Sequence, residues 1–179
     1  EFTRNARMTS AANSLLAAMY LARTEAIKRR AFVTVCASSN PNADTPTCDE
    51  DGDFNGWIVF VDDDGDPDSG SGEEGNGTFE PAAGAGDEVL LKTSDQRSDS
   101  LTFLPSTSYV QFGGNGFQSR SDGSAPADIN VRICDSRGST QIGSSGSAAR
   151  LIELSRTGRP VVSRDETAIK SLGGCPSDA

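Results

Sequence analysis

Four cysteines carry the clearest chemistry in this chain: Cys36, Cys48, Cys134 and Cys175. They form no CxxC pair, and an even number of widely spaced cysteines in a chain rich in glycine and serine indicates two disulfide bonds. Three pairings are possible, and we favour Cys36 with Cys48 and Cys134 with Cys175. In the chain-entropy model these bridges would stabilise the fold by about 3 and about 4 kcal/mol. They also indicate an oxidising compartment: the periplasm, the cell surface or the exterior.

A second group of candidate residues is a run of alternating aspartates, Asp62, Asp64, Asp66 and Asp68. Calcium binds several carboxylate oxygens at once, so such a run is a candidate calcium site. In the EF-hand pattern a glycine would directly follow Asp66, but Pro67 stands there instead. The pattern therefore favours a solvated loop over a calcium site, and calcium is the one cofactor that the sequence suggests.

Three arginines around a tight turn at Gly158 form the third group: Arg156, Arg159 and Arg164. Guanidinium groups on a projecting turn would hold phosphates in a bidentate way, which makes these arginines candidate DNA-binding residues. The whole chain, however, has 16 basic and 26 acidic residues and a net charge of −10. It should repel polyanions and anionic membrane surfaces, so any DNA binding needs a local basic patch.

The composition argues against catalysis. The chain contains no histidine, which excludes Ser-His-Asp triads and HExxH zinc sites. It also has no GxSxG nucleophile pattern, and no GK[ST] follows the glycines at 113–116, as a phosphate-binding loop would require. We therefore expect a protein that is not an enzyme.

Hydrophobic periodicity predicts the elements that position these residues. The apolar residues of the first segment recur at alternating steps of four and three, which places them on one stripe of a helix over residues 3–30: Met8, Ala12, Leu15, Met19, Ala22 and Ala26. Strands are predicted at residues 32–37, 56–62, 88–93, 100–104, 109–112, 129–134, 149–155 and 160–163. Residues 63–87 contain hardly any apolar side chain, so we expect a solvated excursion that does not pack.

These elements predict one helix and one β-rich unit. Residues 1–30 would form the amphipathic helix, and residues 31–179 would form a globular head. A helix on the order of 40 Å long is longer than one small sheet covers, so we expect its N-terminal part to protrude as a stalk. The sequence has no run of about 18 apolar residues and no secretory signal. We expect either a mature secreted form or a piece cut from a longer precursor, and the uninterrupted helical start favours the second.

Several motifs resemble a known family. They are Ala12-Asn13, the helix segment 21–29, Val33 to Cys36, the strand 56–62 with Trp57, and the segment 155–160 that precedes the last cysteine. Together they resemble the soluble part of the FimT, FimU and GspH family, which comprises minor type IV pilins and type II secretion pseudopilins. The resemblance implies an α+β, type IV pilin-like fold, with a long N-terminal helix packed on antiparallel sheets in a β-sandwich-like head.

The resemblance also implies a function in assembly. By this resemblance the protein would take part in the initiation of type IV pilus assembly and would sit at the pilus tip. It would be anchored in the inner membrane by an N-terminal segment, with its domain in the periplasm, and would later lie in the extracellular pilus. Its partners would be other minor pilins and the major pilin, contacted through helix surface that its own sheets leave uncovered. The expected contact residues are Arg4, Met8, Ala11 and Leu15.

Two alternatives stay open. One is a DNA-binding minor pilin that serves DNA uptake in natural transformation. FimT relatives of this kind carry a Gly-Arg-x-Arg element. The corresponding residues here are Gly158-Arg159-Pro160-Val161, so Arg159 matches the first arginine of the element and the second arginine is missing. The other alternative is a minor pseudopilin of the type II secretion system, which would share the fold and differ in its partners.

Overall fold

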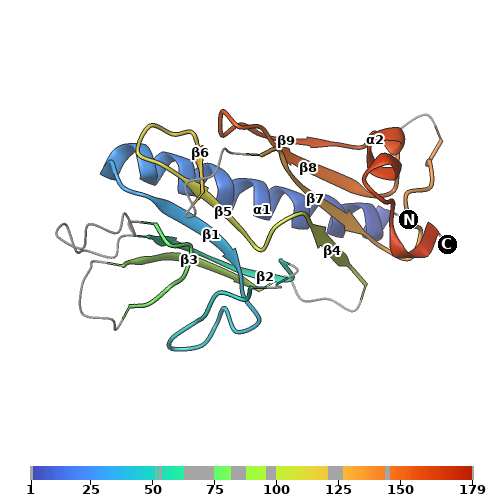
Figure 1. The fold of residues 1–179 in the computed structure, drawn as a ribbon. Coiled ribbons are helices and arrows are strands. Elements are labelled where there is room, and N and C mark those ends of the chain that lie inside the picture. Colours follow the sequence, from blue (N-terminus) through green and yellow to red (C-terminus); the bar gives the residue numbers. More distant parts are fainter. Residues whose placement is uncertain are drawn as a thin grey trace.

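The computed structural model describes residues 2–50, 52, 54–62, 75–81, 88–95, 100–120, 127–143 and 146–178. One long helix lies along two antiparallel sheets, and the two ends of the described chain lie at the same end of the molecule (Figure 1). The elements, in chain order, are α1 (Phe2–Arg29), β1 (Val33–Ala37), β2 (Gly56–Val61), β3 (Leu90–Asp95), β4 (Thr102–Pro105), β5 (Tyr109–Phe112), β6 (Gln118–Ser119), β7 (Ile129–Cys134), β8 (Arg150–Leu154), β9 (Pro160–Ser163), α2 (Glu166–Ser171) and the 3₁₀ turn η1 (Pro176–Asp178).

The strands form two sheets that share α1. The first sheet has the order β3-β2-β1-β5-β6 and the second has the order β4-β7-β8-β9, and all neighbours pair antiparallel. The predicted α+β fold with a long helix on antiparallel sheets is confirmed. Each predicted strand overlaps an observed one, but β3 begins two residues later than predicted. A hairpin turn at residues 113–116 with a return strand from Phe117 was also predicted, and β6 is that return strand. The short elements α2 and η1 were not predicted.

The apolar stripe of α1 is buried along the whole helix. Residues of the stripe from Met8 to Ala26 are at most 1 % exposed. The reason is that α1 contacts both sheets, through β1, β2 and β5 of the first and β7, β8 and β9 of the second. The expectation of a protruding stalk is therefore wrong. The two sheets together cover a longer part of α1 than one small sheet would. Within the described residues, no helix is long and apolar enough to cross a lipid bilayer.

Strand β2 is buried on both faces. Trp57 and Val59 point into the core beneath α1, whereas Ile58 and Phe60 join a smaller cluster on the other face. Phe79 belongs to this second cluster, and its ring centroid lies 5.1 Å from that of Phe60. The excursion predicted for residues 63–87 is thus packed at 75–81, contrary to expectation, because Phe79 covers the outer face of β2. Residues 63–74 and 82–87 lie outside the described residues.

Candidate interaction surfaces

Both disulfides join the cysteines in the favoured pairing. Cys36 and Cys48 have Cα atoms 5.6 Å apart and close a short loop beside the first sheet. Cys134 and Cys175 have Cα atoms 5.9 Å apart and are separated by 41 residues. The second bridge fastens the C-terminal segment to the end of β7. The predicted pairing is confirmed.

Asp62, the first candidate calcium ligand, is a buried part of the fold. Its Oδ2 atom accepts hydrogen bonds from Thr34 Oγ1 at 2.5 Å, Gln111 Nε2 at 2.9 Å and the Gly77 backbone N–H at 3.0 Å. The carboxylate therefore ties β1 and β5 to the segment at 75–77. The other three candidates, Asp64, Asp66 and Asp68, lie outside the described residues.

The calcium site remains a prediction. No group of three or more His, Cys, Asp or Glu residues in the described part of the chain is arranged to hold a metal ion. The hydrogen bonds that the Asp62 carboxylate accepts explain its place in the fold without any role in calcium binding.

Replacing Asp62 with alanine is expected to lower the free energy of unfolding by about 1–3 kcal/mol, because three buried donors would lose their acceptor. Urea denaturation measures this change. The matched control is Asp44→Ala, at an exposed aspartate in the loop after β1, where a change within about 0.5 kcal/mol is expected. Equal effects of the two substitutions would contradict the structural role of Asp62.

The structure does not bring the three candidate DNA-binding arginines together. Arg156 and Arg159 are both exposed on the turn between β8 and β9. That turn packs closely on the β5–β6 hairpin: Gly158 has φ +74°, and a Cβ atom there would lie 2.5 Å from the Gly116 carbonyl oxygen. Arg164 follows the far end of β9, where its Nε donates to the Ser147 carbonyl at 2.9 Å. The expectation of one three-arginine group is wrong because strand β9 separates its members.

The helix residues expected to contact partners are mostly core residues. Met8, Ala11 and Leu15 are at most 1 % exposed because the domain's own sheets cover them. This expectation is therefore wrong for these three, and only Arg4 is exposed. Six of the exposed residues of α1 recur at steps of four and three on the side opposite the buried stripe, and we call them the outer face: Ala6, Ser10, Asn13, Ala17, Tyr20 and Thr24.

Polar contacts at both ends hold α1 in place. Four hydrogen bonds join it to distant segments: Arg137 Nη1 to Asn5 Oδ1 at 2.9 Å, Arg150 Nη2 to Thr9 Oγ1 at 3.2 Å, Tyr20 OH to the Pro160 carbonyl at 3.2 Å, and Arg23 Nε to the Gly116 carbonyl at 3.0 Å. Sequence reasoning missed these residues, because each pair is more than 90 positions apart. The contacts fix the rotation of the helix, so the outer face is presented as a rigid surface.

A buried ion pair supports one of these contacts. Arg137 Nη2 lies 2.6 Å from Asp135 Oδ2, and both side chains are largely buried. Burial opposes ionisation of Asp135, but the hydrogen bonds and charge of Arg137 outweigh it and hold the pKa of Asp135 below its ordinary value. Asp135 therefore stays charged near neutral pH and keeps the Arg137 guanidinium aimed at Asn5.

Comparisons with known proteins agree with this geometry. A long N-terminal helix that buries one face on antiparallel sheets and exposes the other is the architecture of pilin-like proteins. Two crystal structures of the type IV minor pilin FimU from Pseudomonas aeruginosa match the fold. One has a TM-score of 0.57 and 19% identity and covers 100% of both chains. The other has a TM-score of 0.54 and 17% identity and covers 96% of this chain and 99% of that one.

The family follows from the sequence match. The family model described as type II transport protein GspH matches residues 11–158, which is most of the chain. The chain therefore belongs to the GspH family, and the resemblance noted in the sequence is confirmed. A comparison with curated protein sequences finds no significant match.

Proposed function

We propose that this chain is a minor pilin that takes part in initiating type IV pilus assembly and sits at the pilus tip. Its family consists of pilins and pseudopilins, which are structural proteins, and this supports a role without catalysis. In this proposal the chain is held in the inner membrane by an N-terminal segment, with its domain in the periplasm, and later becomes part of the extracellular pilus. The two disulfides support such an oxidising environment.

The observation that carries this proposal is the outer face of α1. Four of its six residues are alanine, serine or threonine, and such small side chains allow another helix to approach closely. The face extends over most of the helix, and hydrogen bonds to β8, to β9 and to two connections between strands hold it in place. A rigid face of small residues fits lateral packing against the helices of other minor pilins and the major pilin.

Replacing Ala17 with arginine is expected to weaken binding to other pilin domains at least ten-fold and to leave the melting temperature nearly unchanged. Ala17 is exposed at the middle of the outer face, so a long charged side chain would block close approach. Arginine is a good helix former, which preserves α1. The measurement is pull-down of pilin domains from the same organism by the purified variant.

The matched control is Ala127→Arg, which makes the same change at an exposed alanine before β7. It should bind partners as the unmodified chain does. If Ala17→Arg retains full binding, or if both variants lose it equally, the outer face is not the assembly surface.

The second candidate is a minor pseudopilin of the type II secretion system, which the description of the matching family model favours. It would use the same outer face with different partners. Pull-down discriminates between the two: recovery of type IV minor pilins supports the first proposal, and recovery of secretion pseudopilins supports the second.

The DNA-binding alternative rests on Arg156 and Arg159, which are exposed on one turn. Arg164 does not join them, and the net charge of −10 opposes a polyanion. A gel shift tests this alternative: it predicts a shift at low salt that Arg159→Ala abolishes. Absence of a shift at low salt would exclude DNA as a partner.

A further inference from the structure

Charge is distributed very unevenly along this chain. Residues 31–99, which supply β1, β2 and β3 with their connections, contain 17 acidic and two basic residues. The rest of the chain contains nine acidic and 14 basic residues. The overall net charge of −10 therefore combines a strongly acidic segment, residues 31–99, with a part whose net charge is positive. This positive part consists of α1 and the residues from 100 onward.

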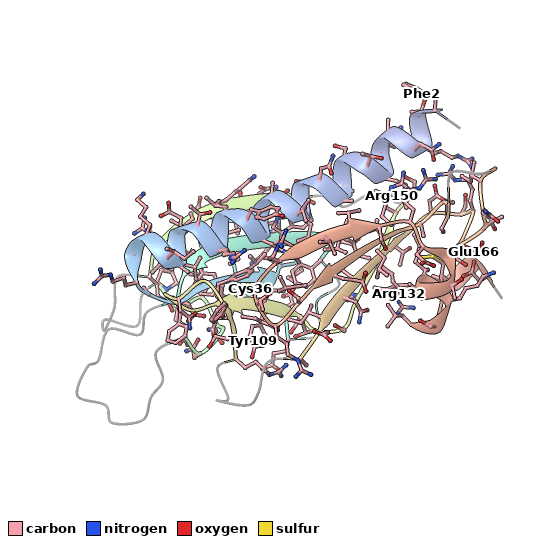
Figure 2. All side chains as sticks on the ribbon, turned by 90° about the horizontal axis from the view of Figure 1, so that it is seen from above. Phe2, Cys36, Tyr109, Arg132, Arg150 and Glu166 are labelled. Carbon is pink, nitrogen blue, oxygen red and sulfur yellow. A yellow bond between two sulfur atoms is a disulfide. The ribbon has the colours of Figure 1, made fainter. Side chains whose placement is uncertain are left out.

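Five arginines of the positive part gather around the N-terminal end of α1, and we call them the arginine cluster: Arg4, Arg7, Arg137, Arg150 and Arg164. Arg4 and Arg7 are exposed on α1 itself. Arg137 and Arg150 bond to the first turns of the helix from the connection after β7 and the start of β8. Figure 2 shows Arg150 near the same end of α1 as Phe2.

Arg150 is a buried member of the arginine cluster. This side chain is almost fully buried and donates to the Ala148 and Ala149 carbonyls as well as to Thr9. Burial, together with the neighbouring charges of Arg164 and Arg137, lowers the pKa of its guanidinium.

The carboxylates at this end of the molecule already have partners. Asp135 pairs with Arg137, and Glu166 pairs with Lys170 at 2.6 Å. Asp165 caps α2, and Asp178 accepts hydrogen bonds from Ser139 and from the Cys175 backbone. Of these acidic groups, Asp135 is buried, whereas Asp165 and Asp178 are exposed. Arg4 and Arg7 are also exposed.

A cleft of about 500 Å³ opens beside the two exposed arginines. Arg4 and Arg7 line it together with the hydroxyl-bearing residues Ser100, Thr102, Ser136 and Ser177, and Leu101 adds an apolar wall. Asp135 also lines the cleft, and its carboxylate is paired with the Arg137 guanidinium. Guanidinium and hydroxyl groups are the donors that phosphate oxygens accept from. The cleft thus combines charge and hydrogen-bonding groups suited to a phosphodiester.

We propose that this cleft and the arginine cluster bind the phosphodiester headgroups of anionic lipids at a membrane surface. The inference rests on the proposed function, in which the domain lies beside the inner membrane. It adds which end of the domain faces that membrane. The basic end would face the bilayer, and the strongly acidic segment 31–99 would be repelled from it. The net charge of −10 opposes a long polyanion that would extend over the whole domain, whereas a lipid headgroup needs only the basic cleft, which favours lipid over nucleic acid.

The test is co-sedimentation of the 179-residue chain with vesicles at low salt. Vesicles that contain phosphatidylglycerol should bind the chain, and pure phosphatidylcholine vesicles should not. Each basic residue near an anionic surface contributes about five-fold to partitioning, so Arg4→Gln with Arg7→Gln is expected to weaken binding about 25-fold.

The matched control is Arg156→Gln with Arg159→Gln, the same charge change at the other end of β8, which should bind like the unmodified chain. Thermal unfolding checks that both variants are folded.

Three results would overturn the inference: no binding to phosphatidylglycerol vesicles, equal losses in the two double variants, or displacement from vesicles by millimolar inorganic phosphate or by duplex DNA. The last would indicate a site for free phosphate or nucleic acid. A chain that recovers pilin partners but binds no vesicles would overturn this inference alone. Vesicle binding without any pilin partner would instead overturn the proposed function.

Discussion

Replacing Leu15 with alanine is expected to lower the free energy of unfolding by about 2–5 kcal/mol, because the side chain is fully buried between α1 and the sheets and its removal leaves a cavity. For a domain of this size the melting temperature should fall by roughly 5–15 °C. Chemical denaturation followed by circular dichroism measures the change. Partner binding should persist at temperatures where the variant remains folded, because Leu15 does not reach the outer face.

The matched control is Leu16→Ala, the same substitution one position further along. Leu16 is partly exposed and is not among the side chains packed on the main core, so its loss should cost less than half as much. If instead Leu15→Ala left stability unchanged and abolished partner binding, Leu15 would be an assembly residue and the burial of the stripe would be refuted.

Removing the second disulfide with Cys134→Ala and Cys175→Ala is expected to lower the free energy of unfolding by about 4 kcal/mol in the chain-entropy model. The bridge spans 41 residues, and it also positions contacts of the C-terminal segment. Among these are the hydrogen bond from Arg132 Nη1 to the Gly174 carbonyl at 2.7 Å and those from Ser139 to Asp178. Urea denaturation measures the loss, and hydrogen exchange should show that α2 and η1 are deprotected first.

The first disulfide provides the comparison. Cys36→Ala with Cys48→Ala opens a loop of only 12 residues, and the expected loss is about 3 kcal/mol. Its effect on hydrogen exchange should centre on the loop after β1 and leave α2 protected. Deprotection of α2 in the Cys36→Ala, Cys48→Ala variant would contradict the conclusion that the second bridge holds the C-terminal segment. Unchanged stability of the Cys134→Ala, Cys175→Ala variant would contradict it as well.

Sequence reasoning located the long elements well, because their patterns are local. The period of the apolar residues identified α1, and alternation identified strands such as β7 and β8. Helix α2 was missed because six residues are too few for a periodic signal, although its N-cap Asp165 accepts a hydrogen bond from Ala168. Packing of Phe79 was missed because a single aromatic residue in a polar segment carries no periodicity.

The interaction surfaces were harder to predict, because they depend on tertiary contacts. The apolar stripe was correctly assigned to one side of α1, but the sequence does not show that two sheets cover it as far as Met8. For the same reason Met8, Ala11 and Leu15 were expected to contact partners, although the domain's own sheets cover them. Arg164 was grouped with Arg156 by proximity in sequence, whereas a four-residue strand carries it away from the turn.

The most direct test of the assembly role is site-specific photo-cross-linking in the assembled state. A photoreactive residue at Ala17, on the outer face, is compared with one at Lys92, an exposed position on the edge strand β3. We expect Ala17 to cross-link to the N-terminal helix of a neighbouring pilin or pseudopilin and Lys92 to give no such product. Cross-links to neighbouring helices from Lys92 but none from Ala17 would contradict lateral packing through the outer face of α1.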